Sequence, residues 1–374
     1  MKVIFTCGGT GGHINPAIAV ANVLRERRPE CEILFVGGEG GMECDLVPKA
    51  GYPIETLRMA SFSRGLAPQA LWHNLRGAVR IAKALSRARA IIRREQPDVI
   101  VGTGGYASFA MLHEGAKLGI PTCVHESNAV PGLTTKLVAG TADKILVSFA
   151  ESRDRYRHPE RVEVVGMPVR QEFIYTKQAD ARKAMGLDDR PMILSAWGSL
   201  GAREMNKIIA GFFKLESKED RYQHVHATGS FGWKWMAEYV KDQGVDLSRH
   251  PNIDMREYIY DMPVMMAAAD LVIGRAGAST LNEIAASGTP CIIVPSPNVT
   301  NDHQEKNAKI LADRGAAVVI HEKDCTPETL YAAADSLLRD PERRMSMRRA
   351  LLDLAVVDSA ERICDVVLRL AKTK

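Results

Sequence analysis

The chain has 374 residues, of which 46% are hydrophobic and 25% are charged, a composition that favours two globular domains of ordinary size. Its seven cysteines are scattered with no pair at CxxC spacing, so we expect neither a disulfide framework nor a zinc site. Free cysteines are typical of a protein in a reducing cytosol, which we expect here. Only Met1 and Lys2 precede the first apolar run, and Gly8 follows within a few residues, which is too short for the core of a signal peptide, so we expect none. No run of about 18 apolar residues occurs, so we expect no membrane-spanning segment.

Short β-type runs alternate with helical patterns along the chain. Predicted strands cover residues 3–6, 32–36, 98–101, 121–125, 144–147 and 162–165, then 192–197, 224–227, 252–255, 271–273, 291–294 and 317–320. Continuous apolar runs such as "DVIV" and "CIIV" are typical of strands buried on both faces of a parallel sheet. Gly166 and Pro168 separate the two series. The sequence therefore predicts an α/β protein of two doubly wound halves, divided near residue 165, with a ligand site in a cleft between them.

The first predicted strand runs into a glycine-rich loop. Four of its five residues are glycine: Gly8, Gly9, Thr10, Gly11 and Gly12. A helix is predicted to start near Asn15–Pro16, since proline favours the first helical turn. Glycines let a ligand approach the backbone, and a helix N-terminus favours anions. We expect ligand contact here; a packing turn between strand and helix is the alternative.

Three more glycine loops follow predicted strands, at residues 102–110, 197–204 and 274–283. The second satisfies the dinucleotide pattern G-x-G-x-x-G/A, and Glu126 ends the next strand, so an NAD-dependent oxidoreductase is a rival. Against that rival, the first loop lacks the pattern and both halves carry such loops. Four strand-end loops indicate a site for phosphate and sugar.

Several catalytic signatures are absent from the sequence. There is no D-x-D pair to hold a metal on a sugar-nucleotide diphosphate, no H-E-x-x-H, no G-K-[ST] and no G-x-S-x-G. We therefore expect no metal and no cofactor. A diphosphate leaving group would be stabilised by backbone N–H groups, a helix dipole and arginine.

An ordered set of motifs carries a resemblance to a known family. The motifs are "GGTGGHINP", "LVPKAGYPI", "GTGGYAS", "HESNAVPG", "MPVR", "GSLGAR", "RAGASTLNEIAASGTP" and "DHQEKNA". Together they resemble the MurG family of UDP-N-acetylglucosamine:muramyl-pentapeptide-pyrophosphoryl-undecaprenol transferases. The resemblance implies a GT-B fold and inverting transfer of N-acetylglucosamine from UDP-GlcNAc to the muramyl C4 hydroxyl of the lipid-linked acceptor. It also implies an acceptor and membrane domain over 1–165, a UDP-GlcNAc domain over 166–345, and a C-terminal helix within about 346–374 that returns to the first domain.

The same resemblance implies roles for individual residues. Thr10, Gly11 and Gly12 would contact the donor or its diphosphate, and Asn128 the donor sugar. Arg170 and Ile259 would lie near uracil, Ser199 near the phosphates, and Ala278, Ser279 and Thr280 beside the diphosphate. Glu283 would accept the ribose hydroxyls and Gln304 would read the sugar. Met167, Trp197 and Leu200 depart from the family pattern and put the fine contacts of the third loop in question.

Inverting transfer needs one base to deprotonate the acceptor hydroxyl. His13 ends the first loop, and its ordinary pKa of about 6.5 suits the task. Glu126 is the second candidate. A histidine or a carboxylate that merely orders its loop is the alternative at each position. His224 and His226 alternate on a predicted strand and are interpreted as structural.

The segment from Arg58 to Arg94 holds nine Lys or Arg and no acid, whereas the whole chain carries only +4. A helical pattern over 69–94 places Arg76, Arg80, Lys83 and Arg87 on one stripe, with Trp72 beside it. No acid within the segment pairs with them, so we expect contact with an anionic membrane surface. A solvated helix face is the alternative.

The sequence thus predicts a peripheral enzyme of the cytoplasmic membrane face. Its expected partners are UDP-GlcNAc, the undecaprenyl-pyrophosphate-linked muramyl-peptide and the anionic membrane, with no nucleic acid. Another GT-B glycolipid transferase, a GT-B sugar epimerase and the NAD-dependent oxidoreductase are the alternatives.

Overall fold

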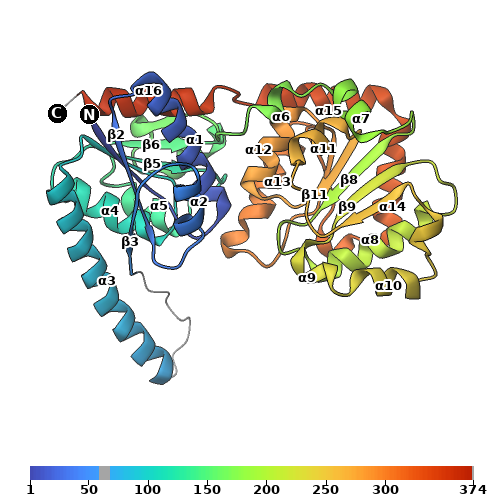
Figure 1. Cartoon of the computed structure of the whole chain (residues 1–374), viewed down its shortest axis with the longest axis horizontal. Coiled ribbons are helices and arrows are strands. Elements are labelled where there is room, and N and C mark those ends of the chain that lie inside the picture. Colours follow the sequence, from blue (N-terminus) through green and yellow to red (C-terminus); the bar gives the residue numbers. More distant parts are fainter. Residues whose placement is uncertain (59–67, 373–374) are drawn as a thin grey trace. The chain divides into compact units, whose positions relative to one another are not determined.

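A computed structural model describes residues 1–58 and 68–372, without the side chains of 68–76 and 78. The chain divides into two compact units (Figure 1). Unit 1 comprises Met1–Val169 with Val356–Lys374, and unit 2 comprises Arg170–Ala355. The chain thus returns to unit 1 after Ala355, whereas the sequence placed that return near residue 345.

Unit 1 is built on a parallel sheet of seven strands in the order β3-β2-β1-β4-β5-β6-β7. Its strands are β1 (Lys2–Thr6), β2 (Glu32–Gly38), β3 (Ile54–Leu57), β4 (Val99–Gly102), β5 (Thr122–Glu126), β6 (Lys144–Val147) and β7 (Val162–Val164). Its helices are α1 (Gly11–Arg27), α2 (Glu43–Lys49), α3 (Pro68–Glu95), α4 (Tyr106–Lys117), α5 (Leu133–Val138) and α16 (Ser359–Ala371), with the 3-10 turns η1 (Ala150–Arg155) and η2 (Pro159–Arg161).

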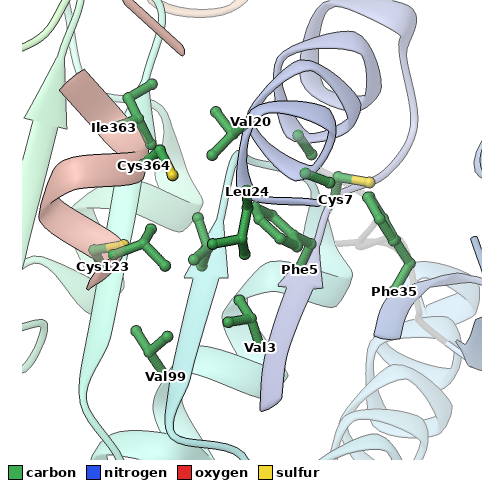
Figure 2. Packing of buried hydrophobic residues seen from close by; sticks show 14 of the residues in the cluster. Val3, Phe5, Cys7, Val20, Leu24, Phe35, Val99, Cys123, Ile363 and Cys364 are labelled. Atoms are coloured by element: carbon green, nitrogen blue, oxygen red, sulfur yellow. The ribbon is translucent and has the colours of Figure 1, made fainter. Parts of the chain in front are cut away.

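The sheet of unit 1 separates two hydrophobic cores, because successive side chains of a strand point to opposite faces. Val3 and Phe5 of β1 pack with α1 and α16, as Figure 2 shows for Leu24 and Ile363. Ile4 faces the other core, which α3 and α4 cover. Helix α16, from the end of the chain, therefore belongs to the fold of unit 1.

Unit 2 repeats the arrangement with six parallel strands in the order β10-β9-β8-β11-β12-β13. Its strands are β8 (Met192–Ala196), β9 (Gln223–Ala227), β10 (Ile253–Arg256), β11 (Leu271–Gly274), β12 (Cys291–Ile293) and β13 (Val318–Val319). Its α-helices are α6 (Glu172–Tyr175), α7 (Gln178–Met185), α8 (Arg203–Glu216), α9 (Gly229–Trp233), α10 (Met236–Asp242), α11 (Met262–Ala268), α12 (Ala278–Ser287), α13 (His303–Asp313), α14 (Pro327–Arg339) and α15 (Pro341–Leu354). Its 3-10 turns are η3 (Leu247–Arg249), η4 (Thr300–Asp302) and η5 (Glu322–Asp324).

The two parallel sheets confirm the predicted doubly wound α/β class, and each predicted strand overlaps an observed one. One strand was missed: β3 has the sequence IETL, pairs only with β2 at the edge of the sheet, and lacks a continuous apolar run. Among the described residues, no helix is long and apolar enough to cross a membrane.

Candidate active site

Helix α1 begins at Gly11, about four residues before the predicted start at Asn15–Pro16. The N–H groups of His13 and of the next residue donate to the carbonyl oxygen of Thr10 at 3.0 and 3.2 Å. Gly11 and Gly12 therefore lie in the first helical turn, where N–H groups have no acceptor within the helix and the helix dipole favours an anion. Contact between these residues and the donor remains a prediction.

The His13 ring is held in one orientation by the first loop. Its Nδ1 lies 3.1 Å from the carbonyl oxygen of Gly8, and the Thr103 hydroxyl donates to the His13 carbonyl at 2.6 Å. A carbonyl oxygen can only accept, so Nδ1 of the neutral ring carries the proton and Nε2 carries the lone pair. His13 is thus in the tautomer that a general base needs.

The second glycine loop packs directly on the first. A Cβ atom on Gly104 would stand 2.7 Å from the His13 ring, and one on Gly105 would stand 2.5 Å from the Gly8 carbonyl oxygen. Both glycines also have positive φ, +122° and +87°. Close packing between the loops accounts for these two glycines of the dinucleotide-like pattern without a bound nucleotide.

Glu126 is buried, and both of its carboxylate oxygens accept hydrogen bonds. The main-chain N–H and the side-chain amide of Asn128 donate to Oε1, each at 3.1 Å. Gly132 N–H and the Thr135 hydroxyl donate to Oε2 at 2.8 and 2.7 Å. Glu126 therefore orders the loop that carries Asn128, and His13 is the stronger candidate for the base.

Glu43 is a residue of this region that the sequence interpretation missed. It is 1% exposed, and its Oε1 accepts from Gly38 N–H at 2.7 Å while Oε2 accepts from Gly9 N–H at 3.2 Å. Because it bonds one N–H of the first loop, Glu43 helps to fix the loop whose carbonyl orients His13. The glycines just before it, at 37, 38, 40 and 41, were the available signal of a tight loop.

In unit 2 the third glycine loop joins β8 to α8. Ser199 is exposed, and its carbonyl oxygen accepts from Ser230 N–H at 3.2 Å. Trp197, one of the departures from the family pattern, is only 4% exposed, and the Arg275 guanidinium lies 5.7 Å from its ring. The indole is therefore buried behind the loop, whereas Leu200 is exposed on it.

The fourth loop leads from β11 into α12, whose first turn holds residues 278–280. N–H groups of a first turn have no partner within the helix, which suits a diphosphate. Arg275 in the same loop donates to the Val294 carbonyl at 3.1 Å and lies 2.5 Å from a Glu322 oxygen. Arg275 is thus engaged in an ion pair with Glu322 inside unit 2.

Glu283 lies in α12 and is mostly shielded from solvent. Burial raises the pKa of its carboxyl to about 7, and the charge of Arg170 opposes that rise. No side chain or backbone N–H of the described residues donates a hydrogen bond to it. A half-buried carboxylate that has no donor among the described residues is available to accept hydrogen bonds from a ligand, and two ribose hydroxyls could supply them.

Two other predicted contacts have mixed support. The Ile259 side chain is 3% exposed, so only its main chain is available to a uracil ring. Gln304 uses its side-chain carbonyl to accept from Ser296 N–H at 2.9 Å, which leaves its amide NH₂ for a sugar hydroxyl. Both contacts remain predictions.

A cavity of about 870 Å³ also lies in unit 2, between the ends of α8 and α13. Its lining mixes prolines with nearly balanced charges, among them Lys207, Lys306, Glu204 and Glu305. None of the residues predicted to bind the donor lines this cavity. Balanced charge does not favour a diphosphate, so we do not assign the donor to it.

The basic segment from Arg58 to Arg94, which includes most of helix α3, is partly neutralised by acids from outside it, which corrects the expectation that its cations are unpaired. The ion pairs are Arg58–Glu39, Arg87–Glu55, Arg89–Glu114 and Arg94–Glu55. Arg80 and Lys83 are exposed and have no carboxylate partner among the described residues. The side chains of Trp72 and Arg76 lie outside the described residues.

Both units match the domains of a known protein family. The Glycosyltransferase family 28 N-terminal domain matches residues 3–147, and the Glycosyltransferase family 28 C-terminal domain matches residues 192–363. A relative from Acetivibrio thermocellus, named as UDP-N-acetylglucosamine--N-acetylmuramyl-(pentapeptide) pyrophosphoryl-undecaprenol N-acetylglucosamine transferase, is 36% identical over 100% of this chain and 99% of its own.

Two solved structures show the same fold. MurG of Acinetobacter baumannii is 28% identical, with a TM-score of 0.76 over 98% of this chain and 99% of its own. A putative UDP-N-acetylglucosamine 2-epimerase from Listeria monocytogenes has a TM-score of 0.72 over 100% of this chain and 97% of its own, but is only 17% identical and shares the fold alone. The predicted GT-B fold class is confirmed. With both of its domains matched, the chain belongs to glycosyltransferase family 28.

Proposed function

We propose that this enzyme transfers N-acetylglucosamine from UDP-GlcNAc, with inversion, to the muramyl C4 hydroxyl of undecaprenyl-pyrophosphoryl-MurNAc-pentapeptide. The full-length similarity to a relative named for this transfer supports the proposal. The product is the lipid-linked disaccharide from which peptidoglycan is assembled.

The geometric observation that carries the donor assignment is Glu283. Its carboxylate is half-buried, has a pKa raised by burial, and receives no hydrogen bond from the described residues. Ribose hydroxyls would supply the missing donors, with the N–H groups at 278–280 and the exposed Ser199 available to the diphosphate. Arg170, whose charge acts on Glu283, would lie near the uracil.

His13 is the proposed base. Its Nε2 would take the proton of the acceptor hydroxyl as that oxygen forms a bond to the anomeric carbon. The bond from the anomeric carbon to the diphosphate oxygen breaks, and UDP leaves with the electron pair. The N–H groups of glycine loops and helix N-termini would stabilise the charge that develops on the leaving group.

The acceptor carries a polyprenyl tail, so the enzyme must meet it at a membrane surface. We propose peripheral association with the anionic cytoplasmic face through Arg80 and Lys83 of α3, which are exposed and have no carboxylate partner among the described residues. Each cation near such a surface contributes about 1 kcal/mol. Arg76 and Trp72 belong to the same predicted stripe in the sequence.

The decisive experiment is turnover of UDP-GlcNAc with a short-chain analogue of the lipid-linked acceptor, with and without EDTA. We expect UDP release only when the acceptor is present, and a product with inverted anomeric configuration. Release of UDP without acceptor, or epimerised sugar, would point to the epimerase reaction. Tighter binding of NADH than of UDP would revive the oxidoreductase, and loss of turnover on chelation would refute the metal-free prediction.

A further inference from the structure

A continuous row of buried polar side chains crosses unit 2 beneath the third glycine loop. Glu216 Oε2 lies 2.8 Å from His224 Nδ1, and His224 Nε2 lies 2.8 Å from Ser195 Oγ. Ser195 Oγ lies 2.7 Å from His226 Nδ1, and His226 Nε2 lies 3.3 Å from Asn206 Oδ1. All five side chains are at most 1% exposed, so the atoms named here depend on their neighbours in the row. The other Glu216 oxygen, Oε1, is buried without a hydrogen-bond partner among the described residues.

The Asn206 end of the row determines which atom of each pair donates the hydrogen bond. The Asn206 amide NH₂ donates to the carbonyl oxygen of Thr228 at 2.8 Å, and that carbonyl can only accept. Asn206 therefore turns Oδ1 toward His226, so His226 Nε2 must carry a proton. Burial and the neighbouring His224 hold the pKa of His226 well below its ordinary value, so its Nδ1 keeps a lone pair.

The remaining donors follow from that assignment. Ser195 donates its hydroxyl proton to His226 Nδ1, and its oxygen then accepts from His224 Nε2–H. Glu216 and His224 Nδ1 share one further proton between them. From His224 Nε2 onward, every hydrogen bond thus points toward Thr228, and reversing any one of these bonds would leave two acceptors facing each other at Asn206.

Thr228 belongs to the segment on which the third glycine loop rests. Ser230 N–H donates to the Ser199 carbonyl at 3.2 Å, and Phe231 N–H donates to the Leu200 carbonyl at 3.3 Å. Gly201 approaches the Thr228 carbonyl so closely that a Cβ atom there would overlap it. The carbonyl that Asn206 holds is therefore part of the surface that sets the position of Ser199.

We propose that this row, Glu216–His224–Ser195–His226–Asn206, positions the third glycine loop for the donor diphosphate. The five are positioning residues that act through the loop and do not touch the donor. The inference rests on the proposed function, because it needs a diphosphate at this loop.

The proton arrangement can be tested on the unaltered full-length protein. In ¹⁵N NMR spectra of the histidine rings at neutral pH, we expect His226 to be protonated at Nε2 and unprotonated at Nδ1, and His224 to be protonated at Nε2. A His226 ring protonated at Nδ1 would overturn the assigned direction, and with it the proposal, whether or not any variant folds.

The functional claim is tested by comparing UDP with uridine, which lacks the diphosphate. Ser195→Ala interrupts the row at its centre, and Asn206→Leu removes the contact with Thr228. For each we expect about a tenfold loss of UDP affinity, the scale of losing one hydrogen bond to a charged ligand, with uridine affinity unchanged. Ser287→Ala is the matched control, because that hydroxyl bonds Ile284 O and Thr289 at the far end of α12.

Three outcomes are distinguishable. A fall in UDP affinity alone supports the positioning role. An equal fall for UDP and uridine, or no change for either, overturns it and leaves the row as packing. Failure of the unaltered protein to bind UDP would instead refute the proposed function.

Discussion

The two units have the same sheet topology but treat their glycine loops differently. In each, the first strand lies inside the sheet, the next two extend it to one edge, and the later strands extend it to the other. In each, a glycine loop joins that first strand to a helix. The topology therefore provides equivalent loops, and only the side chains decide what those loops do.

In unit 1, neighbouring residues of the same unit provide hydrogen-bond partners and packing contacts for much of the first glycine loop. Glu43 accepts from Gly9 N–H, Gly8 accepts from the His13 ring, and Gly104 packs against that ring. In unit 2, by contrast, the half-buried carboxylate of Glu283 has no hydrogen-bond donor among the described residues. Internal contacts thus hold the His13 ring in one orientation in unit 1, whereas in unit 2 the Glu283 carboxylate remains open to a ligand, as the proposed function requires.

The largest expected effect tests the role given to unit 1. His13→Ala should lower kcat by about 100-fold or more and leave the affinity for UDP-GlcNAc nearly unchanged, because a general base contributes on that scale. Steady-state kinetics with the acceptor analogue, together with calorimetry of donor binding, measure the two quantities. If turnover stays within a few-fold of the original, the base lies elsewhere and Glu126 becomes the leading candidate.

The next effect tests unit 2. Glu283→Ala should weaken UDP-GlcNAc binding by about 2 kcal/mol, or roughly 30-fold, the scale of hydrogen bonds to a charged group. Calorimetry gives the affinity, and circular dichroism checks the fold. Asp313→Ala is the control, since that carboxylate pairs with Lys309 on an exposed part of α13. Unchanged affinity in a folded Glu283 variant would show that the ribose assignment is wrong.

The sequence predicted most of this frame because buried parallel strands have a plain signature. The run at β4 is apolar in every position before its glycine, and it was recognised. The edge strand β3 lacks such a run and was missed. Glycine loops could be located in the same way, since the residues that form them are contiguous.

Contacts between distant residues could not be predicted in this way. Glu43 accepts a hydrogen bond from the N–H of Gly9, which lies 34 positions away in the sequence. No motif near either residue indicates that the two are in contact. The basic segment appeared unpaired because only its own acids were counted, whereas Glu55 from β3 pairs with Arg87. His224 and His226 were interpreted as structural, but the serine and asparagine that join them to the loop come from other elements.

A third prediction concerns the pH dependence of UDP-GlcNAc binding, which we assign to unit 2. Because burial raises the pKa of Glu283 to about 7, its ionised fraction in the free enzyme should rise steeply between pH 6 and 8. Ribose hydroxyls bind the ionised form, so UDP-GlcNAc affinity should increase by about tenfold over that range. UDP-GlcNAc itself does not titrate there, so calorimetry at several pH values reports the protein. A flat profile would contradict the assignment.

The Glu283 carboxyl should lower the free energy of unfolding at the pH values at which it is ionised and binds the donor. Its pKa lies above the ordinary value of 4.5, so its contribution to folding is fully present below about pH 4.5 and is lost as pH rises through about 7. At pH 8 Glu283→Gln should therefore raise the free energy of unfolding, by at most about 3 kcal/mol. It should also abolish the pH dependence of donor binding. A less stable Glu283→Gln variant at pH 8 would show that the carboxylate already has a partner.

The smallest effect concerns the surface of unit 1. Lys83 on α3 is exposed without a carboxylate partner among the described residues, whereas Arg87 on the same stripe lies 3.7 Å from Glu55 and donates to the Thr56 carbonyl at 3.1 Å. A cation near an anionic bilayer contributes about 1 kcal/mol, so Lys83→Gln should weaken binding to phosphatidylserine-containing vesicles by about five-fold. Arg87→Gln should weaken it less, because Glu55 already offsets that charge, and both effects should shrink with added salt as screening increases. Co-sedimentation at low and high salt measures the difference between two neighbouring cations that differ mainly in their partners. Equal sedimentation of Lys83→Gln and the original protein at low salt would mean that this part of the stripe is a solvated face, and that any membrane contact involves other residues.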